Sequence, residues 1–308
     1  MSGKKEIGGY FSIECFHTPL YHSNGVMLNS GRNALRHILR TYGVGTLYVP
    51  FYTCPVVREA VQLEKCRIIF YRVNDDLLPE SDLPHDAFIL YNNYFGVSGK
   101  KVEAMAARYP NLIVDNAQSF YSAPRGLAAF YSPRKFFGLP DGGIALCGKN
   151  TAENYPLDTM SHTRASHLLI RPDLGAPAGY AQFSENDDSL CGADILQMSP
   201  LTLAMMGNID YDTAKQRRLE NFRYLNEKLE PEKVWDLAED DVPMVYPYKT
   251  DDPELRKKLI SEKIFVAAYW PGMDSCCEHL RQSVLPLPLD QRYDLDDMKR
   301  IVDNIKEK

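Results

Sequence analysis

Between residues 30 and 150 the chain alternates between two apolar patterns, and this alternation most restricts the folds that it can adopt. One pattern has the apolar spacing of a helix face, and the other consists of short apolar runs typical of buried strands. The helical pattern covers 30–42, a stretch from Pro55 and 101–109, and the strand pattern covers 46–49, 66–71, 87–91, 112–114, 127–131 and 143–147. Strands that alternate with helices predict βαβ units, and hence a mostly parallel sheet with helices on both faces. We therefore expect an α/β fold with a three-layer α/β/α large domain, whose ligands bind at the carboxyl ends of the strands.

The sequence after residue 150 predicts a second, smaller unit. Residues 150–208 have weak periodicity and several prolines, which indicates an irregular excursion with short helices. A helix at 211–229, rich in Arg, Lys and Glu, is expected to bridge into a small α+β domain. In that domain we expect strands near 244–248 and 264–269 and helices at 253–262 and 294–306. The predicted domains are therefore 1–208 and 209–308.

Composition and charge exclude several classes of function. The 308 residues are 44% hydrophobic and 25% charged, and the net charge of −6 argues against nucleic-acid binding. The seven cysteines are scattered without a CxxC pair, which favours reduced thiols and a cytoplasmic protein. No apolar stretch reaches the roughly 18 residues that span a bilayer, so no membrane partner is expected. His162 and His167 lack a metal-ligand spacing, and no metal site is expected.

The first stretch with chemical potential is NSGRNAL at 29–35, where a Ser-Gly turn opens directly into a predicted helix. The start of a helix offers unpaired N–H groups and about half a positive charge, so it can hold a phosphate group. Ser30 could add a hydroxyl, Gly31 a close approach and Arg32 a charge. Alternatively, Ser30 is an ordinary helix cap.

The second stretch is IVDNAQS at 113–119, in which Asp115 ends a predicted strand. A carboxylate there can pair with a pyridinium nitrogen and keep it protonated, so that the ring acts as an electron sink. Gln118 could reach the phenolic oxygen of such a ring. Alternatively, Asp115 only caps the turn that follows the strand.

The third stretch is FYSPRKFFGLPDGG at 130–143, with Lys135 in a turn between two predicted strands. A lysine in a partly apolar, cation-rich pocket has a lowered pKa and can act as an amine nucleophile, and Arg134 could contribute to that. Gly142 and Gly143 would let the backbone approach a ligand closely. An exposed loop lysine is the alternative. The three stretches together, in this order, are what pyridoxal-phosphate enzymes of the aspartate-aminotransferase fold require.

Over roughly residues 26–306 the chain resembles the DegT-type sugar aminotransferases. The segments that carry the resemblance are SGRNAL, VPFYTCPVV, YNNYFGV, VDNAQS, FYSPRKFFGLPDGG, QRRLENFRYLNEKL and VLPLPL. The resemblance implies a pyridoxal-phosphate transferase of fold type I. It implies that Lys135 is the Schiff-base lysine and general acid and base, Asp115 the pyridinium partner and Gln118 a neighbour of the ring, with Gly31 and Arg32 at the phosphate. It also implies a homodimer with active sites at the subunit interface, nucleotide-linked keto sugars as substrates and an amino donor such as glutamate.

The chain departs from the family pattern at two cofactor contacts. The aromatic residue that stacks on the cofactor ring would be Tyr52 or one of the residues between Tyr91 and Phe95. The family often has a phosphate-binding serine at the position of Phe130, and Ser132 is the nearby replacement. Two other functions stay open. One is a cofactor-dependent sugar dehydratase or lyase, although relatives of that kind have histidine in place of the lysine. The other is a non-catalytic regulatory or binding protein that retains the fold.

Overall fold

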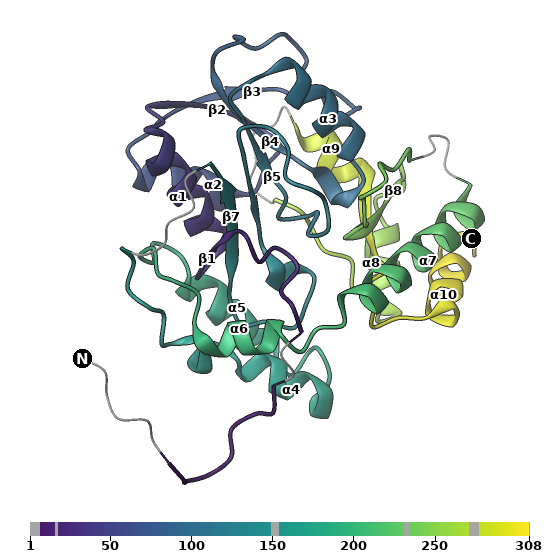
Figure 1. The fold of residues 1–308 in the computed structure, drawn as a ribbon. Coiled ribbons are helices and arrows are strands. Elements are labelled where there is room, and N and C mark those ends of the chain that lie inside the picture. The colour runs from purple at the N-terminus through teal and green to yellow at the C-terminus, as the bar shows by residue number, and fades with distance from the viewer. Residues whose placement is uncertain (1–6, 16–17, 149–153, 231–234, 271–276, 308) are drawn as a thin grey trace.

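A seven-stranded sheet forms the centre of the molecule in the computed structural model, which describes residues 7–15, 18–148, 154–230, 235–270 and 277–307 (Figure 1). Its strand order is β1-β7-β6-β5-β4-β2-β3. Strands β2 to β6 pair in parallel, whereas β7 is antiparallel to both β6 and β1. The strands are β1 (Val26–Leu28), β2 (Thr46–Pro50), β3 (Arg67–Tyr71), β4 (Phe88–Asn92), β5 (Leu112–Asp115), β6 (Ala128–Tyr131) and β7 (Gly143–Cys147). The mostly parallel α/β sheet predicted from the alternating pattern is confirmed.

Each face of the sheet carries its own apolar core. In β5, Ile113 packs into the core under α1 (Gly31–Tyr42) and α2 (Pro55–Leu63), whereas Leu112 and Val114 pack into the core on the other face. Alternate residues of a strand point to opposite faces, so a strand of continuous apolar residues is buried on both sides. The second core also holds side chains of α3 (Gly99–Arg108). The three-layer arrangement follows from these two cores.

Helix α1 forms where the sequence predicts it, for the expected local reasons. The Ser30 hydroxyl accepts a hydrogen bond from the Asn33 N–H at 3.2 Å, which satisfies one of the free donors at the helix start. Gly43 ends the helix with φ 61°, a left-handed conformation that glycine adopts without strain.

The excursion after β7 is anchored to the sheet by Asp141, which is fully buried. Its carboxylate accepts hydrogen bonds from Ser161 and Thr202, each at 2.5 Å, and pairs with Arg164 at 2.9 Å. A buried carboxylate needs such partners to offset its lost hydration. The helices of the excursion are η3 (Ser161–Arg164), α4 (Ser166–Leu174), α5 (Tyr180–Ser189) and α6 (Pro200–Met206).

The C-terminal part contains a two-stranded antiparallel sheet, and one prediction for it is wrong. The long helix α7 (Tyr211–Leu229) leads into β8 (Val245–Lys249), and α7 packs against the last helix, α10 (Leu295–Lys306), as Figure 1 shows. Residues 264–269 form no strand, and the partner of β8 is β9 (Val284–Pro288). The remaining helices are α8 (Leu255–Ser261) and α9 (Glu278–Ser283). The division into domains at 208 stays a prediction.

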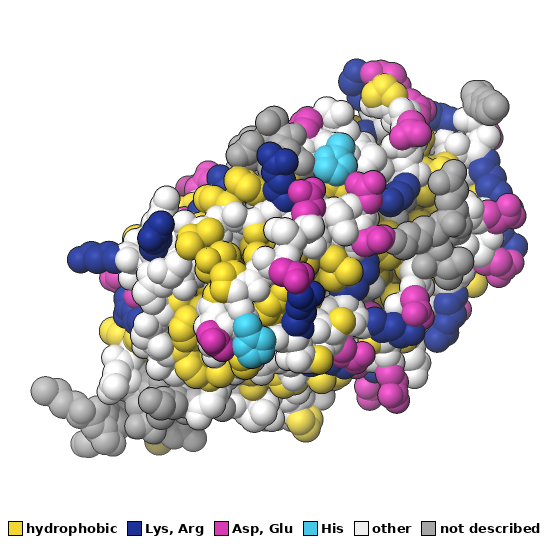
Figure 2. Space-filling model, turned by 90° about the horizontal axis from the view of Figure 1, so that it is seen from above, with side chains coloured by type: hydrophobic (Ala, Val, Ile, Leu, Met, Phe, Trp, Pro, Cys, Tyr) yellow, Lys and Arg dark blue, Asp and Glu magenta, His cyan; other side chains and the backbone are white. Residues whose placement is uncertain are grey.

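The surface carries charges of both signs. On the face seen in Figure 2, basic and acidic side chains are interspersed, with hydrophobic side chains between them. In the part of the chain that the structure describes, no helix has the length and apolar character needed to cross a membrane.

Candidate active site

The three chemically promising stretches meet at one edge of the sheet. The carboxyl ends of β1, β5 and β6 lie at the same edge, and the antiparallel β7 begins there. Helix α1 follows β1, Asp115 is the last residue of β5, and Lys135 lies in the short helix η2 (Pro133–Lys135) that follows β6. The open edge of a parallel sheet is where such folds bind ligands.

The start of α1 lies against the turn that follows β6. A Cβ atom on Gly31 would stand 3.3 Å from the Cβ of Ser132 and 3.6 Å from its hydroxyl oxygen, so the two residues are direct neighbours. Ser132 is buried, and the N–H groups of the first turn of α1 are at this junction. The site therefore combines a helix start, a missing side chain at Gly31 and two hydroxyl groups, from Ser30 and Ser132.

Gly143 has a different role from the expected approach to a ligand. A Cβ atom there would lie 2.0 Å from the Ser30 carbonyl oxygen and 2.5 Å from the Gly31 nitrogen. Only glycine lets β7 pass this close to the start of α1. Gly143 thus positions the helix start itself.

Asp115 is a buried carboxylate with one open oxygen. Its Oδ1 accepts a hydrogen bond from the Ala117 N–H at 2.8 Å, and its Oδ2 has no hydrogen-bond donor among the described residues. Burial raises the pKa of Asp115, while the positive charge of Lys135 and the Ala117 N–H act in the opposite direction. The site therefore favours a further positive partner at this carboxylate.

Gln118 is buried with a fixed orientation. Its Oε1 accepts a hydrogen bond from the Phe95 N–H at 2.8 Å. Because an N–H group can only donate, the oxygen must face Phe95, and the amide nitrogen Nε2 must point the other way. This nitrogen has no partner among the described residues, so it remains a donor for a ligand. Phe95 itself has φ 60°, a conformation that is uncommon for a residue other than glycine.

The side chain of Lys135 is exposed, whereas its backbone is fixed within the turn. The Lys135 N–H donates to the Ser132 carbonyl at 3.1 Å. The side chain of Arg134 is instead held by an acidic residue, since its guanidinium pairs with Asp187 of α5 at 3.1 Å. Arg32 approaches the same carboxylate at 3.7 Å and Glu59 at 3.9 Å. Both arginines are thus drawn towards acidic side chains at this edge.

The aromatic residues suggested for ring stacking are buried. Tyr52 is 2% exposed, stacks on Tyr94 at 5.6 Å between ring centroids and contacts Trp270 edge-on at 4.6 Å. Burial raises the pKa of the Tyr52 phenol. Phe130 points into the core between β6 and α1, and it is therefore not available to a ligand.

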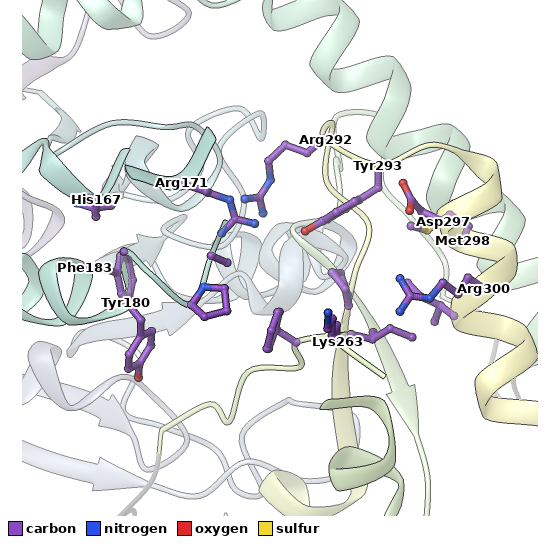
Figure 3. A pocket seen from close by; sticks show the side chains of 17 residues that line it. His167, Arg171, Tyr180, Phe183, Lys263, Arg292, Tyr293, Asp297, Met298 and Arg300 are labelled. Atoms are coloured by element: carbon purple, nitrogen blue, oxygen red, sulfur yellow. The ribbon is translucent and has the colours of Figure 1, made fainter. Parts of the chain in front are cut away.

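A cavity of about 650 Å³ lies between the excursion and the C-terminal part (Figure 3). Figure 3 shows Arg171 and Arg292 with their guanidinium groups near each other in this cavity, and Tyr293 with its hydroxyl directed inward. Phe183 lines the same cavity and lies 6.0 Å from the Arg134 guanidinium, so the cavity adjoins the turn that holds Lys135. Its lining combines aromatic rings with positive charge.

Among the described residues, no three His, Cys, Asp or Glu side chains are grouped to hold a metal ion.

Comparisons with known proteins give structural neighbours only. No protein-family model and no curated protein matches the sequence. Among solved structures, a DegT DnrJ EryC1 StrS aminotransferase from Brucella abortus is 20% identical, with a TM-score of 0.60 over 92% of this chain and 85% of that one. The sugar aminotransferase CalS13 from Micromonospora echinospora is 17% identical, with a TM-score of 0.64 over 92% and 87%. DesI, solved in the presence of its TDP-sugar product, is 17% identical, with a TM-score of 0.64 over 91% and 79%.

This chain has the fold of these aminotransferases. The fold-type prediction of a pyridoxal-phosphate transferase architecture is thereby confirmed, with α7 and the two-stranded sheet following the large sheet.

Sequence reasoning found the residues at the sheet edge but missed those of the cavity. Arg171, Lys263 and Arg292 line the cavity from three separate parts of the chain, and none of them belongs to a local motif. The sequence around Arg171 gave only weak periodicity, which indicated an irregular excursion with short helices.

Proposed function

We propose that this protein is a pyridoxal-phosphate-dependent aminotransferase that uses Lys135 as its cofactor lysine. The observation that supports this most is Asp115, a buried carboxylate with an open oxygen at the same sheet edge as Lys135 and the start of α1. The fold shared with the aminotransferases supports the same proposal.

The residues at the sheet edge fit this cofactor in their donor and acceptor chemistry. Asp115 Oδ2 would accept from the protonated ring nitrogen, and Gln118 Nε2 would donate to the phenolic oxygen. The phosphate would bind at the N–H groups of the α1 start, with Ser30, Gly31 and Ser132 around it and the Arg32 charge nearby. When bound, the cofactor supplies an electron sink that stabilises negative charge on the substrate carbon. Tyr52 is buried against Tyr94 and Trp270, so stacking of Tyr52 on the ring would require these aromatic contacts to rearrange.

Lys135 and Asp115 would have different roles at the reacting atoms. Lys135 Nζ would hold the cofactor and, once released, would move the proton between the substrate carbon and the carbon that receives the amino group. Asp115 would stay negative to keep the ring nitrogen protonated, and the positive ring would reverse the effect of burial on the pKa of Asp115. Because the Lys135 side chain is exposed, its amine would be accessible to both the cofactor and the substrate.

For the acceptor substrate we infer a nucleotide-linked keto sugar, with an amino acid such as glutamate as the donor. The cavity beside the Lys135 turn supports this inference, because Arg171 and Lys263 would attract phosphate groups and Tyr180 and Phe183 offer flat apolar surfaces to a base. DesI was solved in the presence of its TDP-sugar product, which agrees with this substrate class.

We also infer that two copies associate. Large apolar side chains are exposed on the N-terminal segment and on the excursion, and covering them with a second protein surface would be favourable. The exposed fractions are 99% for Tyr10, 96% for Phe11, 66% for Leu169, 71% for Leu174 and 68% for Tyr180. A homodimer would cover these side chains.

A non-catalytic binding protein with this fold is the second candidate. Arg32 is drawn to Asp187 and Glu59, and Tyr52 is buried in an aromatic cluster, so two expected cofactor contacts are engaged elsewhere. Such a protein would bind the cofactor or a sugar nucleotide without turnover.

Addition of glutamate to the cofactor-loaded protein tests the proposal. An aminotransferase takes up the amino group, so the visible band at roughly 400–430 nm should give way to the shorter-wavelength band of the amine form, and 2-oxoglutarate should appear in equal amount. A keto-sugar nucleotide should then restore the visible band. A stable visible band with every amino acid tried would instead support the non-catalytic candidate.

A further inference from the structure

Arg218 of α7 is a fully buried guanidinium that lies next to the turn holding Lys135. It is 1% exposed, and burial lowers its pKa to about 10. The largest charge effect that opposes this lowering comes from Asp290, whose carboxylate is itself paired with Arg292 at 2.7 Å. A buried cation without its own carboxylate is unfavourable unless its donors are all used. The hydrogen bonds of Arg218 therefore indicate why this position holds an arginine.

All three guanidinium nitrogens of Arg218 donate hydrogen bonds, and they join three separate segments. Nη1 donates to the carbonyls of Pro243 and Met244 at 3.2 and 3.1 Å. Nε donates to Gln291 Oε1 at 2.8 Å, and Nη2 donates to the Phe136 carbonyl at 3.1 Å. The guanidinium also lies 4.4 Å from the centroid of the Phe136 ring. Phe136 is the residue that directly follows Lys135.

Gln291 closes this arrangement from the loop between β9 and α10. Its Nε2 donates to the same Phe136 carbonyl at 2.7 Å, while its Oε1 accepts from Arg218. The Phe136 carbonyl thus accepts two hydrogen bonds, both from residues beyond position 208. On the other side, the N–H groups of Phe136 and Phe137 donate to the Pro133 carbonyl at 3.0 Å each. The backbone on both sides of the Lys135 side chain is therefore fixed, although that side chain is exposed.

We propose that Arg218 and Gln291 are positioning residues that clamp the Phe136 carbonyl and thereby set the position of the Lys135 amine over the sheet edge. This proposal rests on the proposed function, in which Lys135 holds the cofactor. Because both residues belong to the C-terminal part, a ligand in the cavity between that part and the excursion could influence the lysine through this clamp: Arg292, which lines the cavity, is the neighbour of Gln291.

The variant Gln291→Glu separates the clamp from the fold. A glutamate keeps the acceptor for Arg218 Nε and provides the carboxylate that this buried cation lacks, so the protein should remain folded. It cannot donate to the Phe136 carbonyl. The control is Tyr71→Phe in the edge strand β3: Tyr71 is buried and its hydroxyl donates to the Leu90 carbonyl at 2.7 Å, so the variant removes one buried hydrogen bond that is not part of the clamp.

Two readouts are measured on the full chain. In the cofactor-free protein, hydrogen exchange at the amides of residues 135–137 should become faster in Gln291→Glu by about 3- to 10-fold, the effect of one hydrogen bond, and should stay unchanged in Tyr71→Phe. With pyridoxal phosphate, the dissociation constant read from the visible band should rise in Gln291→Glu by a similar factor, and the pH midpoint of that band should shift. In Tyr71→Phe only the melting temperature should fall.

The outcomes separate the clamp from the proposed function. Unchanged exchange and an unchanged visible band in Gln291→Glu would overturn the clamp while leaving Lys135 as the cofactor lysine. Equal changes in Tyr71→Phe would also overturn it, since they would indicate general loosening of the protein. If the wild-type protein forms no visible band, the proposed function fails, and the positioning role of the clamp fails with it.

Discussion

Gln118 combines two tasks that can be separated chemically. Its Oε1 holds the backbone N–H of Phe95, which has a left-handed conformation, and its Nε2 is left for a ligand. The first task concerns stability and the second concerns the cofactor. A left-handed phenylalanine is sustained only when its surroundings fix it, and Gln118 is one of the residues that do so.

We predict different effects for two substitutions of Gln118. Gln118→Leu leaves the buried Phe95 N–H without an acceptor and should lower the free energy of unfolding by about 1–3 kcal/mol. Gln118→Glu keeps an acceptor, so the cofactor-free protein should be more stable than Gln118→Leu. Both lack the amide donor and should bind pyridoxal phosphate about 3- to 10-fold more weakly at pH 8, measured by spectral titration. Wild-type affinity in Gln118→Glu would contradict the donor role.

Asp115→Asn should have opposite effects on stability and on amino transfer. Burial raises the pKa of the folded carboxyl, so its proton favours the fold, and this contribution is lost as the pH rises above the ordinary aspartate range near ~4. In cofactor-free protein, Asn should therefore raise the melting temperature at pH 7, with the gain shrinking towards pH 4. With cofactor, the amide cannot keep the ring nitrogen protonated, and amino transfer should fall by at least about 100-fold. Full transfer activity in Asp115→Asn would exclude the pyridinium role.

The residue-level chemistry at the sheet edge was predictable because it lies in contiguous stretches. Asp115, Gln118 and Lys135 each lie within a few residues of a strand end, and strand ends follow from apolar patterns. The partners of Arg32 were not predictable, since Asp187 is far away in sequence and lies in a helix without strong periodicity. The burial of Tyr52 depends on Trp270, which lies beyond the whole sheet in sequence.

At the scale of elements, the contact between β7 and α1 sets the geometry of the helix start. Gly143 is the position where the two meet most closely, because its hydrogen points where a Cβ atom would collide with backbone. Ser30 and Gly142 also form an isolated β-bridge next to this contact. The strand and the helix start therefore behave as one rigid unit.

Gly143→Ala should disturb this unit far more than an alanine elsewhere. The added methyl group would stand 2.0 Å from the Ser30 carbonyl oxygen, and backbone cannot rotate away as a side chain can. We expect a loss of about 3 kcal/mol in the free energy of unfolding and weaker phosphate binding at α1. In Gly45→Ala the methyl group meets nothing within 4 Å, so that variant should lie within about 0.5 kcal/mol of wild type. Chemical denaturation measures both, and equal stability of the two variants would refute the contact.

Strand predictions succeeded for the central strands, which are buried on both faces, and also for the partly exposed β3 and β8, but they missed β1 and β9. The central strands have continuous apolar runs, which periodicity detects. Strand β1 escaped notice because it has only three residues. In β9, Pro286 and Pro288 disguise the strand, since proline lacks a backbone donor and is rare inside sheets. At 264–269 the run of mostly apolar residues led to the prediction of a strand, but this segment pairs with no strand among the described residues.

For the whole molecule, the exposed apolar side chains of the excursion predict association of two copies. The double variant Leu169→Glu, Tyr180→Glu introduces charges on α4 and α5, where the native side chains are 66% and 68% exposed. The dimer should dissociate at least about 10-fold more readily, as measured by sedimentation equilibrium. The control Ile260→Glu, at a side chain of α8 that is 42% exposed, should leave association unchanged. A wild-type protein with the mass of one chain at all concentrations would contradict the prediction.

In the whole molecule, one continuous apolar core connects the C-terminal part with the sheet, next to the cavity. The apolar core on one face of the sheet continues into the C-terminal part, through residues such as Tyr246, Leu287 and Ile301. A ligand between the excursion and the C-terminal part would therefore contact a unit that also carries Arg218 and Gln291. This continuity is a tertiary property that no local pattern in the sequence could indicate.

The identity of the cofactor lysine can be measured directly. Purified protein is incubated with pyridoxal phosphate, separated from free cofactor, scanned at roughly 400–430 nm, reduced with borohydride and digested for peptide mass mapping. We predict a visible band in wild type and in the control Lys257→Ala, no band in Lys135→Ala, and the reduced cofactor attached to Lys135. A protein that stays colourless, or a label on another lysine with the band intact in Lys135→Ala, would contradict the account.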